Sequence, residues 1–225
     1  MYTKALELEP THFKALFNRT FGEDQLKSYT RAVSDYTTAL QLDPRSPFTY
    51  YNLGISHDHK GCYTRAVEAF THVSAPDKSQ PDFFHNRGFT QRKQGAYTSA
   101  IADYTTAVSL DLNHLKSYYN RAYCFSKLDR YNEAVTDNTA ALQINSGNAS
   151  AYHNRGVSQE KLGRLGGGAA VKDFGRAPKH DPKLTLALNA RGLVYDQLHQ
   201  FDKALANFTE AIRLDQHNPY LAAQS

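Results

Sequence analysis

The sequence contains no long hydrophobic run. Apolar residues make up 40% of its 225 residues, which is an ordinary share for a folded soluble protein. No window approaches the length of a membrane span. The opening residues, MYTKALELEP, already follow a helical pattern and do not resemble a signal peptide. We therefore expect neither a membrane partner nor a leader sequence.

The chain also has little excess charge and few cysteines. Its 26 basic and 22 acidic residues leave a net charge of +4, which is too small to indicate a nucleic-acid partner. Cys62 and Cys124 lie in different copies of the repeat described below, so the sequence predicts neither a disulfide framework nor a metal site. Unpaired cysteines and the missing leader favour a cytosolic protein, and a cytoskeletal or ciliary association stays open.

What the sequence does contain is a repeat, of which the stretch from Pro81 to His114 is one copy. This stretch has the spacing of two amphipathic helices with a break at Gln94 and Gly95. Sliding the sequence by the length of that stretch brings five asparagines into register: Asn18, Asn52, Asn86, Asn120 and Asn154. Such a fixed period predicts an all-α array of helix pairs.

The repeat boundaries follow when Pro81 is counted as repeat position 1. The sequence then predicts repeats at 13–46, 47–80, 81–114, 115–148, 149–184 and 185–218. Residues 1–12 match the second helix of an earlier repeat, and residues 219–225 match the start of a later one. We expect a single solenoid over residues 1–225, which is either a fragment of a longer array or covered at its ends, with self-association through those ends open.

The residues at fixed repeat positions resemble the tetratricopeptide repeat family. Repeat three carries Phe84, Gly88, Ala100, Tyr104 and Ala107 where that family places its large, small, small, aromatic and small residues. A small residue opposite alanine lets two helices approach closely, and the aromatic residue fills the gap towards the next repeat. The resemblance implies a right-handed superhelical solenoid of helix-turn-helix units.

Three repeats depart from this pattern. Repeat one has Gly22, Glu23 and Asp24 inside its first helix, which should weaken that helix. Repeat two has Pro76 where its second helix should make the last turn, so this helix must stop early. Repeat five has an insertion with three glycines at 166–168 and is the predicted place for mobility and a bend.

An arginine and an aspartate recur at matched positions in four repeats. The arginine follows the asparagine, and the aspartate comes at one fixed spacing after it, which only the insertion in repeat five lengthens. The pairs are Arg19 with Asp35, Arg87 with Asp103, Arg121 with Asp137 and Arg155 with Asp173. We predict structural ion pairs between the first and second helices.

The five asparagines form the candidate binding surface. First helices line the concave side of such a solenoid, so the asparagines should form a ladder along a groove. Other predicted groove residues are Tyr51, Tyr119, Phe89 and Tyr123, with a basic stripe of Lys93, Lys127 and Lys161. Amides offer the donors and acceptors that an extended peptide backbone needs.

Two resemblances bear on this groove. The asparagine run is similar to that of the superhelical repeat domain of the intracellular N-acetylglucosamine transferase, which implies sequence-tolerant peptide capture. The alternative is that each amide bonds locally. For the carboxylate clamp of chaperone-binding relatives, Asn86 and Lys116 match, whereas Tyr51, Ile55 and Asn120 differ. This leaves too little positive charge for a carboxylate, and we predict no clamp.

No pattern indicates catalysis or a cofactor. His85 and His153 occupy equivalent groove positions but lie two repeats apart, too far to share a metal or a substrate atom. The glycines at 166–168 lack the lysine of a phosphate-binding loop, and a code for RNA would need more basic charge. We predict a non-enzymatic scaffold, without catalytic or metal-binding residues, that holds extended segments of partner proteins. The alternative is a structural component that packs through its ends and convex face.

Overall fold

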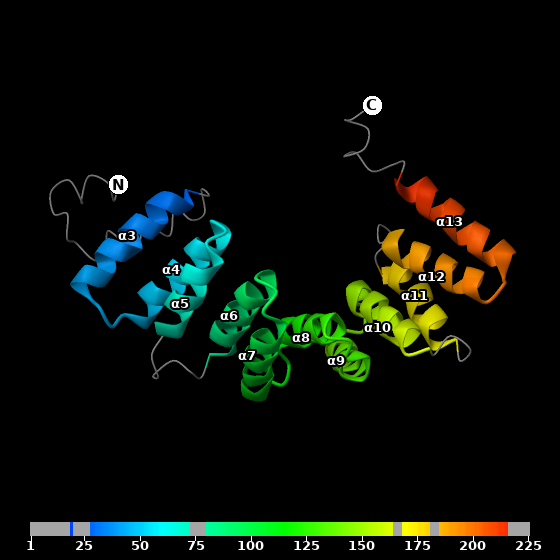
Figure 1. Cartoon of the computed structure of the whole chain (residues 1–225), viewed down its shortest axis with the longest axis horizontal. Helices are drawn as coiled ribbons and strands as arrows, with labels where there is room; N and C mark the ends of the chain where they lie inside the picture. The colour runs from blue at the N-terminus through cyan, green and yellow to red at the C-terminus, as the bar shows by residue number, and fades with distance from the viewer. Residues whose placement is uncertain (1–18, 20–27, 73–79, 164–167, 181–184, 216–225) are drawn as a thin grey trace, which may run out of the picture. The chain divides into compact units, whose positions relative to one another are not determined.

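The described residues form α-helices and no strand. The computed structural model describes residues 19, 28–72, 80–163, 168–180 and 185–215, and these contain eleven helices (Figure 1). The all-α fold of paired helices is therefore confirmed. The predictions for Asn18, residues 1–12, Gly22 to Asp24, Gly166, Gly167 and residues 219–225 lie outside the described residues.

The chain divides into two compact units, Met1–Leu112 and Asn113–Ser225. The first unit holds α3 (Tyr29–Leu42), α4 (Pro47–His59), α5 (Tyr63–His72), α6 (Pro81–Lys93) and α7 (Tyr97–Leu110). The second unit holds α8 (Leu115–Lys127), α9 (Tyr131–Ile144), α10 (Ala149–Lys161), α11 (Ala169–His180), α12 (Thr185–Gln197) and α13 (Phe201–Asp215). That the 225 residues make a single solenoid stays a prediction.

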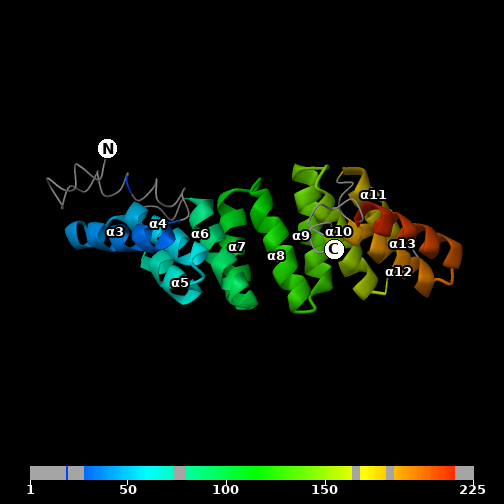
Figure 2. The same ribbon diagram turned by 90° about the horizontal axis from the view of Figure 1, so that it is seen from above.

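Each first helix of the described ranges packs beside the second helix of its own repeat. In both views α6 lies beside α7, and α12 lies beside α13 (Figures 1 and 2). The first helices α4, α6, α8, α10 and α12 begin at the residues with which repeats two to six were predicted to begin. Proline suits the first turn of α4 and α6 because its missing N–H would have no partner there. Ser46 and Asn148 cap α4 and α10 through their side-chain oxygens.

A residue in the left-handed conformation follows each first helix of the described ranges. Gly61, Gly95 and Gly163 have φ values of +82°, +80° and +69°. Asp129 and His199 occupy the same repeat position with φ values of 57° and 56°. This conformation lets the chain turn after the last helical carbonyls have been satisfied, and glycine adopts it at little cost. The predicted break at Gln94 and Gly95 is one instance of this shared turn.

The two helices of a repeat approach closely because the first helix carries glycine at the crossing. A Cβ atom added to Gly54, Gly156 or Gly192 would lie 2.7, 2.7 or 2.6 Å from a ring carbon of Phe70, Phe174 or Phe208, respectively, on the second helix. Repeat four replaces this pair with Ala122 and Asn138, both fully buried. The smaller amide leaves room for the alanine methyl group.

The second helix of repeat two, α5, is described from Tyr63 to His72. Pro76 lies outside the described residues, so the early stop that it predicts stays a prediction. None of the helices in the described ranges is long and apolar enough to cross a membrane.

The close approach predicts how two glycine substitutions should differ. Gly156→Ala should lower the free energy of unfolding by about 1–3 kcal/mol, because its Cβ would overlap the Phe174 ring. Gly175→Ala is the matched control, since its Cβ would meet only the far end of the Arg191 side chain. Urea unfolding monitored by circular dichroism measures both. Equal midpoints for the two variants would contradict the packing argument.

Candidate functional site

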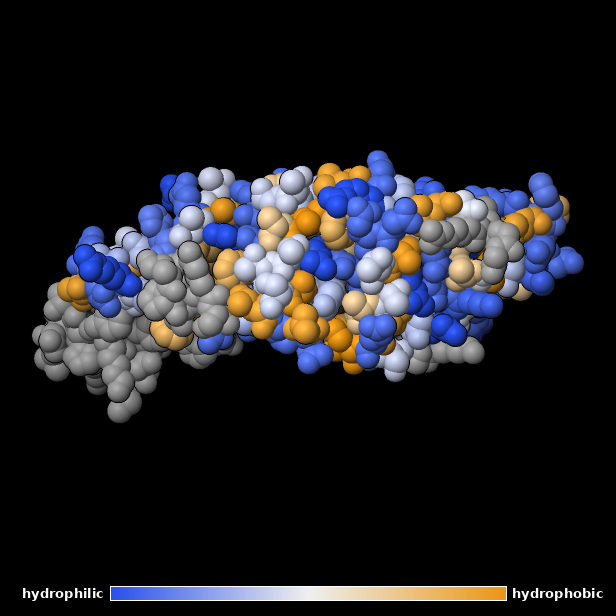
Figure 3. Space-filling model, turned by 90° about the horizontal axis from the view of Figure 1, so that it is seen from below, coloured by the Kyte–Doolittle hydropathy of each residue, from blue (hydrophilic) through white to orange (hydrophobic). Residues whose placement is uncertain are grey.

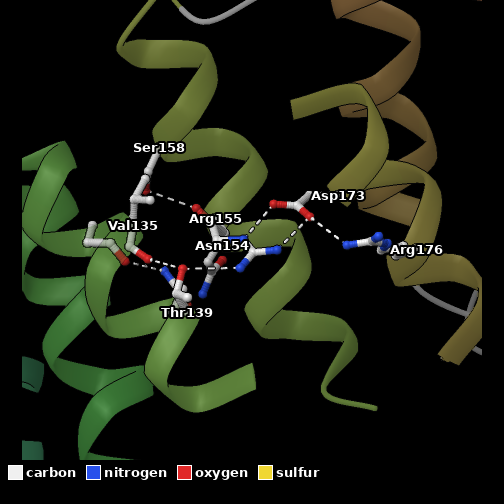
Figure 4. Close-up of polar contacts among 9 residues, drawn as sticks. Val135, Thr139, Asn154, Arg155, Ser158, Asp173 and Arg176 are labelled. Atoms are coloured by element: carbon white, nitrogen blue, oxygen red, sulfur yellow. Dashed lines mark hydrogen bonds and ion pairs between the residues drawn. The ribbon is translucent and has the colours of Figure 1, made fainter. Parts of the chain in front are cut away.

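Bidentate ion pairs join the two helices of four repeats. Arg155 on α10 donates from Nε and Nη2 to the carboxylate oxygens of Asp173 on α11, at 2.6 and 2.8 Å (Figure 4). The same fork joins Arg19 to Asp35, Arg87 to Asp103 and Arg121 to Asp137, with N···O distances of 2.6 to 2.8 Å. The structure thus brings together each arginine with the aspartate expected from the spacing.

These pairs are mostly shielded from water. The side chains of Arg155 and Asp173 are 15% and 4% exposed. The hydrogen bond to Asp173 raises the pKa of Arg155, so this guanidinium stays charged. Burial raises the pKa of Asp137, and Arg121 opposes that shift. Buried charges of this kind need their partner to remain in the folded protein, which favours a structural role.

The two repeats without an aspartate replace the ion pair in different ways. In repeat six, Arg191 Nε donates to Asn207 Oδ1 at 2.6 Å, so an amide oxygen takes the place of the carboxylate. In repeat two, Leu53 occupies the arginine position and Ala69 the aspartate position, and both belong to one apolar cluster. The two repeat positions thus hold an arginine–aspartate pair, an arginine–asparagine pair or an apolar pair. In each case the two side chains suit one another in polarity.

The asparagines of the ladder differ in their hydrogen bonds. Asn52 and Asn120 donate from Nδ2 to the carbonyl oxygens of Phe48 and Lys116 one turn earlier, at 2.8 and 2.9 Å. Asn86 instead donates to the Tyr51 hydroxyl oxygen, at 2.6 Å. Bonding within the protein, the alternative to peptide capture, thus uses one N–H group of each of these three residues.

Asn154 is the exception within the described part of the ladder. It is half-buried on α10, and its side-chain amide makes no hydrogen bond to other described residues. Its backbone carbonyl oxygen accepts from Ser158 Oγ, as Figure 4 shows. An amide whose two donors and acceptor make no hydrogen bond within the described residues is the kind of group that can bind a peptide backbone.

The position before the asparagine does not face a groove as predicted. His85 is only 7% exposed, and its ring packs against Phe89 and Tyr104. His153 packs on Phe174, and burial lowers its pKa. The predicted groove position of these histidines is therefore wrong. A side chain one residue from the asparagine is rotated by about 100° around the helix and points towards the second helix.

Tyr51 and Tyr119 occupy the same repeat position and are half-buried. The Tyr51 ring packs against Phe70 and Phe83, with centroids 5.9 and 4.5 Å away. Burial, with a smaller effect of Asp82, raises the pKa of Tyr51 and keeps its hydroxyl protonated. Tyr51 thus serves the contact between repeats two and three, and only its hydroxyl group reaches the asparagine ladder.

An open hollow lies between the first helices α4 and α6. It has a volume of about 240 Å³ and is lined by Ile55, Asp58, His59, Phe70, Asn86, Phe89 and Thr90. The carboxylate of Asp58 accepts from Thr90 Oγ1 at 2.9 Å and from Lys93 Nζ at 2.6 Å. The hollow is mainly apolar, with the Asn86 amide at its wall. The sequence did not indicate that Phe70 and Thr90 line this hollow. Ile55 and Phe89 share one repeat position, and this position was the signal in the sequence that could have located the hollow.

The basic stripe is only partly available to a partner. Lys93 is paired with Asp58 and lies 4.8 Å from the centroid of the Phe89 ring. Lys127 lies 5.4 Å from the centroid of Tyr123, a half-buried residue of the predicted groove. Lys161 is exposed. On the face drawn in Figure 3, hydrophobic residues are scattered among hydrophilic ones. In the described ranges, no three His, Cys, Asp or Glu side chains are placed to hold a metal ion.

The chain belongs to the tetratricopeptide repeat family. Models of this repeat match residues 35–68, 81–114, 115–148 and 185–218, which together make up more than half of the sequence. Three of the four matched segments coincide with predicted repeats. The segment 35–68 begins instead within the second helix of repeat one. No curated protein matches the chain significantly in sequence.

Several solved structures share the fold. YrrB, described as "a TPR protein with an unusual peptide-binding site", is 24% identical with a TM-score of 0.72. The match covers 85% of this chain and 97% of YrrB. MamA 41-end from Desulfovibrio magneticus RS-1 is 18% identical with a TM-score of 0.71, over 76% of this chain and 96% of that protein. At these identities the likeness establishes the fold.

The ion pairs predict a specific order of stabilities. Asp173→Ala should lower the free energy of unfolding by about 3–5 kcal/mol, because Arg155 would be left buried without a counter-charge. Asp173→Asn should cost only about 1–2 kcal/mol, since Asn207 accepts from Arg191 in the same way.

The control for this series is Glu210→Ala. It removes an exposed ion pair with Arg213 on α13 and should not change the thermal midpoint measurably. Calorimetry of the three variants gives the comparison. An Asp173→Ala protein as stable as the Glu210→Ala control would show that the buried pair does not hold the two helices together.

Proposed function

We propose that this chain is a protein-interaction scaffold that holds extended segments of partner proteins along the exposed face of its first helices. The proposal rests above all on Asn154, which is half-buried on α10 and whose side-chain amide makes no hydrogen bond to other described residues. A peptide backbone presents one donor and one acceptor per residue, and an asparagine side chain can satisfy both.

The other asparagines can contribute less. Asn52 uses one N–H group for a bond to its own helix and is half-buried, whereas Asn120 makes the same bond but is only 9% exposed and offers a partner little. Asn86 spends one on Tyr51, but its amide also lines the hollow between α4 and α6. In the first unit, a partner whose backbone binds Asn86 would place one of its own side chains over Ile55 and Phe89, which line the hollow.

The known structures give this proposal some support. YrrB is described as having a peptide-binding site, and its fold extends over most of this chain. Proteins that share a fold can differ in function, so the asparagines of the first helices carry the proposal. We propose that the partners are proteins and that the chain acts without a cofactor, in the cytosol.

The alternative is a structural component that packs on a large assembly. It is favoured by the exposed apolar residues of the last two helices, including Leu186 and Leu205, which are 63% and 67% exposed. Exposed apolar residues of this kind indicate a contact surface. In that case the asparagine face would stay empty, and substitutions on it would have no effect on binding.

A pull-down from cell extract distinguishes the two functions. Asn154→Ala should weaken capture of the partner about three- to tenfold, the loss expected for one or two backbone hydrogen bonds. It should leave stability unchanged, because this amide supports no other described residue. Titration of the captured partner by calorimetry gives the affinity, and circular dichroism verifies the fold.

Asn132→Ala is the matched control, since Asn132 is exposed on the second helix α9. It should bind the partner as tightly as the unchanged chain. If Asn154→Ala and Asn132→Ala both retain full affinity, the partner does not use the asparagine face, and the structural alternative is favoured.

A further inference from the structure

Polar contacts join the first helices α4 and α6 of the first unit. Asn86 on α6 donates from Nδ2 to the Tyr51 hydroxyl oxygen on α4, at 2.6 Å. Two turns further along α6, Lys93 Nζ donates to the carboxylate of Asp58 on α4, also at 2.6 Å. The fold therefore uses an amide of the asparagine ladder and a lysine of the basic stripe to hold α6 to the first helix before it.

The amide contact has no counterpart between α8 and α10, two first helices of the second unit that contact one another. Asn154 on α10 and Tyr119 on α8 occupy the repeat positions of Asn86 and Tyr51, and both are half-buried. The Asn154 amide nevertheless makes no hydrogen bond to Tyr119 or to any other described residue. Its donors and its acceptor thus stay available to a partner.

The ion pair has no counterpart there either, because a hydroxyl group replaces the carboxylate. Ser126 on α8 occupies the repeat position of Asp58, and its hydroxyl oxygen lies 3.3 Å from that of Ser158 on α10. Lys161, the equivalent lysine on α10, is exposed and pairs with no carboxylate among the described residues. Glu160 precedes it on the same helix, but adjacent residues of a helix do not face each other.

The Asn154 amide and the Lys161 ammonium lie on one face of α10, with an apolar residue between them. Asn154, Val157 and Lys161 follow one another at steps of three and four residues, which keeps their side chains on one side of the helix. Val157 is half-buried and offers an apolar contact. Asn154 and Lys161 are two turns apart, about 10 Å along the helix axis, a distance that an extended segment spans with about three residues.

The lysines give this side of α8 and α10 a positive charge. Lys127 on α8 occupies the repeat position of Lys161 and is exposed as well. Its ammonium lies 5.4 Å from the centroid of the Tyr123 ring and forms no ion pair in the part of the chain that the structure describes. A partner segment with carboxylates complements this charge, and a basic segment is repelled by it.

We propose that the second unit selects extended partner segments that carry an acidic residue. The partner backbone binds the Asn154 amide, an apolar side chain packs on Val157, and an aspartate or glutamate about three residues from the bound backbone group pairs with Lys161. The partner thus supplies the carboxylate that Asp58 supplies to Lys93 in the first unit. This inference rests on the proposed function of the asparagine face and adds the charge that the partner must carry.

Peptide selection tests this preference. A library of random linear peptides displayed on phage is selected against the full chain and, in parallel, against the Lys161→Glu chain. The unchanged chain should enrich peptides with an acidic residue close to an apolar one, and the variant should enrich lysine or arginine in place of the acid. Since Lys161 is exposed, the variant should fold normally, which circular dichroism verifies.

A binding cycle with one enriched peptide locates the contact. In fluorescence anisotropy, Lys161→Gln should weaken binding of that peptide about two- to fivefold. The same substitution should have no effect on a peptide in which glutamine replaces the acidic residue. Lys172→Gln is the matched control and should leave both affinities unchanged, since Lys172 is exposed on the second helix α11.

Enriched peptides without acidic residues would overturn the proposal, and so would the absence of enriched peptides. One acidic pattern shared by both selections would also overturn it, because the carboxylate would then bind elsewhere. Asn154→Ala separates these failures from that of the proposed function. If it weakens binding of enriched peptides that lack acids, the asparagine face binds partners and only the preference for acids is wrong. If those peptides bind it unchanged, the proposed function fails as well.

Discussion

The close contact between the two helices of each repeat determines which residues the chain can present to a partner. Gly54, Gly156 and Gly192 bring the first helix against an aromatic ring of the second, with no room for a methyl group. The buried ion pair one residue away, such as Arg155 with Asp173, prevents rotation of one helix against the other. Since the glycine and arginine positions face inwards, the asparagine position on the same helix lies nearer the surface: Asn52, Asn86 and Asn154 are half-buried, whereas Asn120 is buried.

The contacts between repeats also involve fixed repeat positions. The Asp58 carboxylate on α4 receives Thr90 and Lys93 from α6, and Thr139 on α9 receives Arg155 from α10. In both interfaces the acceptors belong to one repeat and the donors to the first helix of the next. The regular spacing of these residues along the chain thus repeats the same kind of polar contact from one interface to another.

The sequence predicts the periodic features of the structure well. Because the period is fixed, a feature of one repeat can be checked against the same position in the other repeats. The sequence could therefore predict where α4, α6, α8, α10 and α12 begin and which arginine contacts which aspartate.

Features that differ between copies could not be predicted. The buried place of His85 depends on the ring of Tyr104, which lies on another helix. The different bonding of Asn52, Asn86 and Asn154 depends on neighbours such as Tyr51, which belongs to the repeat before that of Asn86. The hollow beside Phe89 needs residues from three helices. Contacts of this kind arise from side-chain conformations and not from the spacing that the sequence displays.

We propose that the partner binds to the asparagine face of the first helices. The most direct measurement is a two-dimensional nitrogen–proton spectrum of the side-chain amides, recorded while a captured partner segment is added. The account predicts that the Asn154 signal shifts until the site is saturated, while the signal of Asn138, which is fully buried on α9, stays in place. An unchanged Asn154 signal, with shifts confined to the second helices, would contradict the account.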